Sequence, residues 1–268
     1  MSDSSLTKDR ASMPSGTAPV LDRRTLKNSN RNLLSLVKPG LTVLDVGCGT
    51  GAITKDIAGL VGTNGSVVGI DLSEELINAA KTNHTSVSNL SFQVQDIFTY
   101  ESDLRFDLIT TARTLQWMNR PKEALLKMKS LLVNGGCISV LDYNHTKIEW
   151  LPAPPASMQQ FYESFLRWRA DAGMDNKIAD NLQAIFSEIG LKNTTITNES
   201  EFYHNKESDF YDTAGIWNKV AETRGNQLVK DGYITESQRI SAIQDYDKWL
   251  KNDAISIKLY LLGVTGYL

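Results

Sequence analysis

Residues 41–145 alternate short apolar runs with segments whose apolar residues recur at helical spacing. The apolar runs predict strands at residues 41–46, 66–70, 90–94, 106–110 and 136–143. The segments between them predict helices at residues 52–62, 74–84 and 122–132, each with one apolar face. This alternation predicts an α/β fold, in which helices cover both faces of a mostly parallel sheet.

The pattern is less regular after residue 145, where prolines at 152, 154 and 155 interrupt it. Aromatic residues at helical spacing over 161–168 predict a helix, and further helices are predicted at 181–189 and within 209–253. Two more strands are predicted, one at 192–202 and a last one at 255–264 that returns to the sheet.

These elements predict one domain over residues 21–268, with a cofactor-binding core at 40–145. We expect a helical cap or insertion at about 150–185 and 205–253. Residues 1–20 begin with a polar, serine-rich segment, and we expect a flexible tail there.

Composition narrows the classes of partner and compartment. The 268 residues are 41% hydrophobic and 22% charged, with a formal net charge of −3 and no basic cluster, so no nucleic-acid partner is expected. No apolar run reaches the roughly 18 residues of a membrane span, and no membrane partner is expected. Only Cys48 and Cys137 occur, far apart, which favours a cytoplasmic location. The three histidines are also far apart, so no metal site is expected, and a monomer and a homodimer both remain open.

A glycine-rich loop follows the first predicted strand. Gly47, Gly49 and Gly51 allow a tight turn and a close approach to a ligand, and the following helix directs free N–H groups at that ligand. The loop also fits the loose dinucleotide-binding pattern. Asp45 argues against that alternative, because a carboxylate beside the loop would repel a pyrophosphate and favour a cation. S-adenosylmethionine carries both a sulfonium and an ammonium group.

Two further acids follow the second and third predicted strands. Asp71 lies roughly 20 residues past the loop, where an acid can accept hydrogen bonds from ribose hydroxyls. Asp96 can accept one from an adenine amino group while Ile97 packs on the ring. The alternatives are a helix N-terminal acid for Asp71 and an ordinary turn residue for Asp96.

Together with the runs at 106–109 and 131–136, these motifs resemble the class I S-adenosylmethionine-dependent methyltransferases of small-molecule type over roughly residues 25–145. The resemblance implies a Rossmann-like seven-stranded sheet of order 3-2-1-4-5-7-6 whose last strand is antiparallel. The family's Asn/Asp-Pro-Pro-Tyr motif is replaced by 111–114, which disfavours amide or nucleobase nitrogens as acceptors.

The resemblance also implies which residues surround S-adenosylmethionine. The methionine part would lie beside Asp45 and the loop residues Gly47, Cys48, Gly49 and Gly51. The ribose would bind Asp71, and the adenine would lie between Leu72, Asp96 and Ile97. Ala112 and Arg113 would lie near the methyl group. Either Arg23 or Arg24 is a candidate to pair with the cofactor carboxylate, and both are equally consistent with an exposed surface.

Methyl transfer from a sulfonium needs alignment of the acceptor and exclusion of water, and it needs a base only if the acceptor carries a proton. His145 is the candidate base, with a solvated loop histidine as the alternative. Trp117 and Tyr143 are candidates to face the acceptor, although Trp117 is equally consistent with core packing or a cofactor lid. We therefore predict a methyltransferase that acts on a small molecule. The alternatives are a nicotinamide-dependent oxidoreductase and a non-catalytic cofactor-binding relative.

Overall fold

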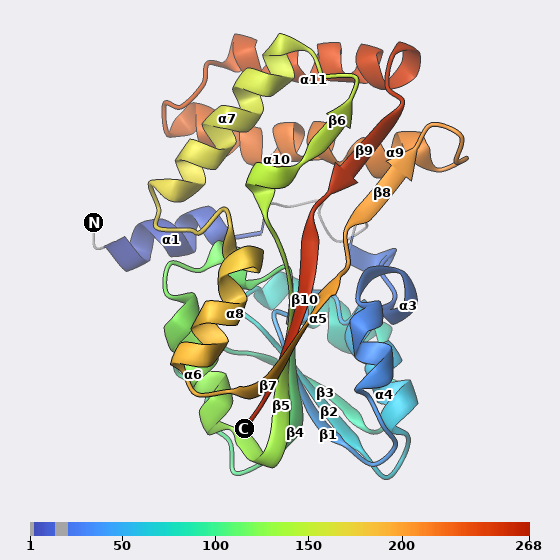
Figure 1. Cartoon of the computed structure of the whole chain (residues 1–268), viewed down its shortest axis with the longest axis vertical. Helices are drawn as coiled ribbons and strands as arrows, with labels where there is room; N and C mark the ends of the chain where they lie inside the picture. The colour runs from blue at the N-terminus through green and yellow to red at the C-terminus, as the bar shows by residue number, and fades with distance from the viewer. Residues whose placement is uncertain (1–2, 14–20) are drawn as a thin grey trace.

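Seven strands form the central sheet in the order β3-β2-β1-β4-β5-β10-β7, as the family resemblance implies. They are β1 (Thr42–Val46), β2 (Ser66–Asp71), β3 (Leu90–Val94), β4 (Phe106–Ala112), β5 (Leu132–Tyr143), β7 (Lys192–Asn198) and β10 (Leu261–Tyr267). Strands β1 to β5 are parallel, whereas β10 is antiparallel to both β5 and β7, so the predicted α/β sheet is confirmed. This computed structural model describes residues 3–13 and 21–268 (Figure 1).

Helices cover both faces of this sheet (Figure 1). On one face, α6 (Pro121–Ser130) and α8 (Ile178–Glu188) pack on alternate strand residues such as Leu44 and Ile109. On the other face, α3 (Leu26–Ser29), η1 (Arg31–Ser35) and α4 (Ala52–Val61) pack on the intervening residues such as Val43 and Leu108. Helix α5 (Glu74–Asn83) lies against β3 and β2. Strands covered on both faces need the nearly continuous apolar runs that the sequence has.

A second sheet contradicts two of the predicted strands. The strand expected at 192–202 is divided into β7 and β8 (Glu201–His204), and the one expected at 255–264 into β9 (Ser256–Leu259) and β10. β8 and β9 leave the central sheet and join β6 (Glu149–Leu151) in an antiparallel sheet of order β6-β9-β8. A turn closed by the Asn198 side chain separates β7 from β8. An apolar, β-rich run does not reveal that the chain changes sheets.

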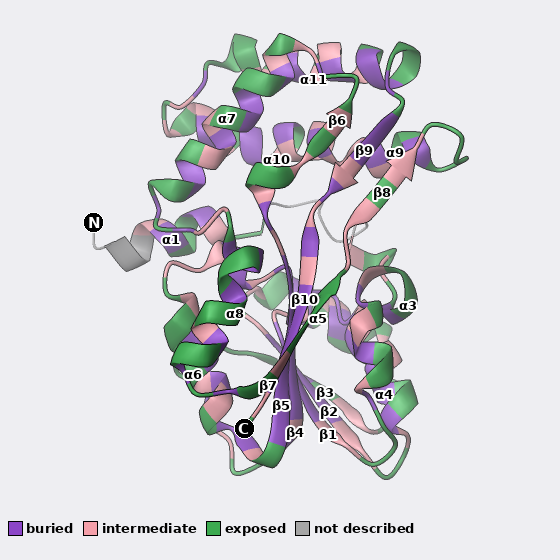
Figure 2. Ribbon diagram, in the orientation of Figure 1, coloured by how far each residue is buried: buried purple, intermediate pink, exposed green. Residues whose placement is uncertain are grey.

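Helices α7 (Ala156–Ala170), α9 (Phe210–Ala214), α10 (Ile216–Lys230) and α11 (Glu236–Asn252) form a cap with this second sheet. They enclose a core of their own, which includes Phe161, Trp168, Trp217 and Tyr246. Figure 2 shows buried residues along the central strands and again on the cap helices. Helix α8 packs on the central sheet, although its first residues fall within the range expected for the cap.

The flexible tail that the sequence predicts over residues 1–20 falls partly on described residues, and a helix lies there. Helix α1 (Asp3–Ala11) lies beside the junction of the central sheet and the cap (Figure 1). Arg10 donates to the Trp168 carbonyl and pairs with Asp231 at 3.2 Å, while Arg224 donates to the Arg10 carbonyl at 2.7 Å. The residues that hold this polar helix in place lie more than 150 positions further along the chain. The amino-acid composition of the helix therefore does not reveal that it packs against the cap. Residues 1, 2 and 14–20 lie outside the described residues. None of the described helices has the length and apolarity needed to cross a bilayer.

Candidate active site

A cavity of about 450 Å³ opens where β1, β2, β3 and β4 end. It lies at the carboxyl edge of the sheet, beside the switch between β1 and β4 where ligands of such folds bind. The loop after β1 lines it, and Gly47, Gly49 and Gly51 all have positive φ angles, of 76°, 57° and 77°. These are left-handed conformations that favour glycine.

The three glycines have different neighbours. Gly47 and Gly49 line the cavity, whereas Gly51 does not and instead packs against the Phe92 ring of β3. A Cβ atom at Gly51 would overlap that ring, and one at Gly47 would overlap the Thr114 side chain. The predicted loop therefore lines the cavity. Gly51 does not line it, and it supports the loop by allowing the close approach of the Phe92 ring.

Asp45 lies at the end of β1 and is buried. Its Oδ2 atom accepts a hydrogen bond of 2.6 Å from the Thr54 hydroxyl of α4. Burial, and then the charge of Asp71, raise the pKa of Asp45 to about 6 despite that bond. Among the described residues no cation pairs with it. Asp45 thus lines the cavity as a buried carboxylate without a counter-charge among the described residues, and a cationic ligand would supply one.

Asp71 and Asp96 line the same cavity and both have protein partners. The Oδ2 atom of Asp71 accepts from the Gly49 amide at 2.9 Å, and its Oδ1 atom accepts from the Ser73 amide at 2.9 Å. Burial raises the pKa of Asp71. Asp96 pairs with Lys8 of α1 at 2.9 Å and accepts from the Phe98 amide. Asp71 therefore stabilises both the glycine loop and its own turn, and Asp96 stabilises its own turn.

Arg113 follows β4 and is the best-anchored charge at the site. Its guanidinium pairs with Glu201 of β8 at 2.5 Å, donates to the Tyr143 hydroxyl at 2.9 Å and donates to the Ser29 carbonyl at 2.8 Å. Burial opposes its charge, but Tyr143 and Glu201 outweigh burial and raise its pKa. Its φ of 57° is unusual for a residue other than glycine, and such strain persists only where the surroundings impose it.

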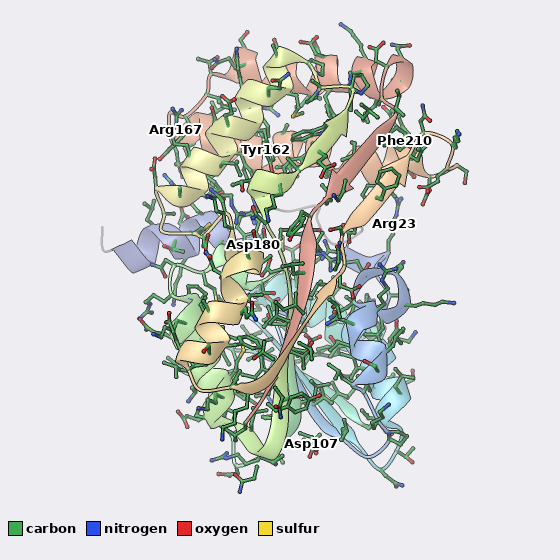
Figure 3. The ribbon with its side chains drawn as sticks, viewed as in Figure 1. Arg23, Asp107, Tyr162, Arg167, Asp180 and Phe210 are labelled. Carbon is green, nitrogen blue, oxygen red and sulfur yellow. The ribbon has the colours of Figure 1, made fainter. Side chains whose placement is uncertain are left out.

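A second cavity, of about 170 Å³, lies against the first and reaches into the cap. Both cavities are lined by Arg24, Arg113 and Trp117, so these residues stand at the junction. The other aromatic residues around the second cavity are Tyr143, His145, Tyr162, Phe165, Trp217 and Tyr260. Figure 3 shows Tyr162 within the cap, where α7 carries it. The second cavity is thus a chamber rich in aromatic side chains that adjoins the larger one.

His145 begins η3 (His145–Lys147), which follows β5 after the single residue Asn144. Its Nε2 atom lies 2.6 Å from Oε1 of Gln116, which also receives Arg169 Nη1 at 3.4 Å. Burial, and then the charge of Arg169, lower the pKa of His145 well below its usual value. The ring is therefore a neutral imidazole at neutral pH, which is the form that accepts a proton.

All the predicted cofactor residues except Gly51 line the larger cavity, including Cys48, Leu72, Ile97 and Ala112. Trp117 lines both cavities, while Tyr143 and His145 line only the smaller one. Arg24 lines both, whereas Arg23 pairs at the surface with Asp212 at 3.5 Å.

Sequence reasoning missed five polar residues of this region, namely Lys8, Gln116, Arg169, Glu201 and Arg224. None of them belongs to a motif, and each reaches the site through the tertiary fold. Gln116 alone carries a signal, because it directly precedes Trp117 in the loop after β4.

Comparison with known proteins agrees with this architecture. Residues 37–215 match the family described as a methyltransferase domain. A probable cobalt-precorrin-6B C(15)-methyltransferase of Thermoplasma acidophilum is 37% identical over 76 residues, 27% of this chain and 38% of that protein. A malonyl-[acyl-carrier protein] O-methyltransferase of Bacillus cereus is 25% identical over 170 residues, 60% of this chain and 59% of that protein. The chain thus spans less than two thirds of either curated relative.

Among solved structures, a Haemonchus contortus phosphoethanolamine N-methyltransferase 2, in complex with phosphomonomethylethanolamine and S-adenosylhomocysteine, superposes with a TM-score of 0.55. It is 14% identical, and the match covers 99% of this chain and 57% of that one. At this identity the likeness concerns the fold.

Proposed function

The chain belongs to the methyltransferase domain family, and from this we propose that it transfers the methyl group of S-adenosylmethionine to a small-molecule acceptor. One observation carries the proposal. The acid-bearing glycine loop lines a cavity that adjoins a smaller aromatic chamber, with Arg24, Arg113 and Trp117 shared between them. A cofactor and an acceptor in these two spaces would meet at the junction, as a direct displacement requires.

The larger cavity fits the cofactor in charge and in shape. Asp45 is buried there without a cation among the described residues, so a sulfonium or an ammonium group would find a counter-charge. A volume of about 450 Å³ lies within the range of small-ligand sites. We assign the methionine part to Asp45 and the loop, including Gly47, Cys48 and Gly49. Gly51 belongs to the same loop, and we assign it the role of allowing the loop's conformation rather than a contact with the cofactor.

The remaining assignments follow the strand ends along the cavity. We assign the ribose to Asp71, the adenine to Leu72, Asp96 and Ile97, and the surroundings of the methyl group to Ala112 and Arg113. Arg24 is the better candidate for the cofactor carboxylate, because it lines the cavity whereas Arg23 is bound at the surface.

Bound S-adenosylmethionine supplies a methyl group attached to a sulfonium, which departs as a neutral thioether. The protein's part is to orient the acceptor and to exclude water, and the aromatic walls of the smaller chamber suit both tasks. Where the acceptor must lose a proton, we propose that Nδ1 of His145 receives it, because Nε2 is engaged with Gln116. Trp117 and Tyr143 would then contact the acceptor.

Calorimetric titration with S-adenosylmethionine, S-adenosylhomocysteine and NADH tests the cofactor. Tight binding of the first two supports the proposal, while tight binding of NADH alone would favour a nicotinamide-dependent oxidoreductase. Turnover of methyl-labelled S-adenosylmethionine against fractionated metabolites then separates an enzyme from a non-catalytic relative. Persistent binding without any methylated product would overturn the proposed activity.

We also propose a cytoplasmic location, without a nucleic-acid or membrane partner. Its support is the pair of free cysteines, Cys48 and Cys137, since unpaired thiols are typical of reducing compartments. A monomer or a homodimer is proposed for the assembly.

A further inference from the structure

We propose that the acceptor is a small acid, with a flat apolar part about the size of one aromatic ring and a carboxylate that arginine binds in the smaller chamber. This inference rests on the proposed function, because it assigns that chamber to the acceptor. Three observations carry it, namely the chamber's size and walls, the sign of the charges that line it, and the lack of a carboxylate partner for two of them.

The chamber has room for about one ring. Its volume of about 170 Å³ is close to that of an engineered cavity of about 150 Å³ that binds benzene. Its aromatic walls meet edge to face, with Tyr162 and Trp217 centroids 4.6 Å apart at 88° and Trp117 and Phe165 centroids 6.4 Å apart at 68°. Such walls favour a flat apolar group, which stacks on ring faces and edges.

The charged side chains that line the chamber are all cationic within the described part of the chain: Arg24, Arg113, Lys219 and Arg224. Two of them have acidic partners. Arg113 pairs with Glu201 at 2.5 Å, and Lys219 pairs with Glu222 at 3.3 Å. The other two are left without a carboxylate.

Arg224 is 4% exposed, so its charge is almost fully withdrawn from water. Its guanidinium lies over the Trp117 ring at 4.4 Å. Within residues 3–13 and 21–268 it donates only to carbonyl oxygens of α1 and the residue after it, those of Arg10, Ala11 and Ser12. No described carboxylate lies within ion-pair distance. Burial, and then repulsion by Arg169, lower the pKa of Arg224 to about 9. An anionic ligand would offset both costs.

Arg24 adds a second cation without an ion-pair partner among the described residues, at the junction of the two cavities. Its guanidinium makes no hydrogen bond or ion pair to any side chain in residues 3–13 and 21–268. Burial, and then the charge of Arg113, lower its pKa, and the nearby Tyr143, Glu201 and Tyr203 offset this only in part. If the cofactor carboxylate occupies Arg24, the Nε–H and the second Nη2–H of Arg224 have no acceptor among the described residues and can still bind the acceptor's carboxylate. The chamber therefore selects against cationic acceptors and favours anionic ones.

Benzoate, benzamide and benzylamine test this inference, because they share one ring and differ in charge at neutral pH. Each is titrated into the protein with saturating S-adenosylhomocysteine, and binding is followed by calorimetry and by quenching of tryptophan fluorescence, to which Trp117 and Trp217 in the chamber contribute. A charge-assisted hydrogen bond predicts that benzoate binds at least about tenfold more tightly than benzamide. We expect benzylamine to bind most weakly.

Three variants locate the preference. R224Q should reduce the benzoate preference to about that of a neutral ligand, while R224K should keep part of it. R23Q removes one positive charge at the surface and should leave the preference unchanged. Because Arg224 also holds α1, thermal unfolding of each variant checks that the fold persists. The inference would be overturned if the protein preferred benzamide or benzylamine, or if it did not bind benzoate at all. It would also be overturned if folded R224Q kept the full preference for benzoate.

The titration with S-adenosylhomocysteine alone separates the two proposals. If it fails to bind, the proposed function fails, whatever the ring compounds do. If it binds and benzoate is not preferred, the cofactor assignment stands and only the acidic acceptor is rejected.

Discussion

The Nε2 atom of His145 lies 2.6 Å from the Oε1 atom of Gln116, and this contact determines which ring nitrogen carries the proton. Two other hydrogen bonds fix the orientation of the Gln116 amide. Its Nε2 donates to the Arg113 carbonyl at 3.0 Å, and its Oε1 accepts a hydrogen bond from Arg169. Oε1 is therefore an acceptor, and the His145 Nε2 must donate to it. The lone pair remains on Nδ1, the atom to which we assign the proton transfer.

This tautomer can be observed directly. Nitrogen NMR of the imidazole should show His145 neutral and protonated at Nε2 throughout the neutral pH range, because burial and Arg169 lower its pKa. Only three histidines occur, so H84Q and H204Q identify the signal. Q116L should remove the Nε2 preference, whereas Q116E should keep it and raise the His145 pKa by adding a negative charge. An Nδ1-protonated ring in the unmodified protein would rule out the assigned role.

The buried pair of Arg113 and Glu201 should contribute to stability in a way that depends on both partners. R113M leaves the Glu201 carboxylate half-buried without its cation and should destabilise the fold by about 3 kcal/mol in urea unfolding. The double variant R113M/E201L should recover much of that loss, since neither charge remains.

The exposed pair of Lys122 and Glu188 provides the control, with an N···O distance of 2.8 Å and side chains 52% and 56% exposed. K122M should cost less than about 1 kcal/mol because solvent already screens the pair. Equal losses in R113M and K122M would show that the contribution of Arg113 does not depend on its burial.

Much of the central sheet could be predicted because its strands are covered on both faces. Val43 and Leu44 point to opposite helical layers, so the run around them must be apolar throughout. The division of the last strands could not be predicted, because Leu259 and Leu261 are both buried, yet they belong to different sheets. The local pattern of apolar residues shows that a residue is buried, but it does not show which sheet or helix buries it.

The candidate site could likewise be predicted only in part. Asp45 and Asp71 stand at fixed distances from strand ends, so sequence spacing alone brings them to one cavity. Arg169 and Arg224 come from cap helices whose docking the sequence does not specify, and their donors are directed at carbonyls or amides rather than at a motif. The acceptor side of the site was therefore less predictable than the cofactor side.

Gly51 should be intolerant of a side chain for two separable reasons. Its φ of 77° is strained for any L residue, and a Cβ atom would overlap the Phe92 ring. Gly40 shares the first property, with a φ of 87°, but has open space around it. We expect G40A to cost about 1 kcal/mol and G51A about 1–3 kcal/mol more, measured by urea unfolding. Equal costs would mean that Phe92 moves away freely.

The affinity for S-adenosylmethionine should depend on pH through Asp45. The pKa of its carboxyl is raised to about 6, chiefly by burial, so the group is ionised above that pH and protonated below it. A cationic ligand is attracted only to the ionised form. Affinity should therefore be constant above about pH 7 and fall by up to tenfold per pH unit below about pH 6.

Calorimetry across this range measures the effect, and two variants attribute it. D45N should weaken binding by about 10- to 100-fold at neutral pH, the value of one charge-assisted contact, and should remove the pH dependence. D103N changes an exposed carboxyl outside both cavities and should leave affinity and its pH profile as they are. Asp71 also has a raised pKa, and a profile that persists unchanged in D45N would transfer the dependence to Asp71 and reject the cation-binding role of Asp45.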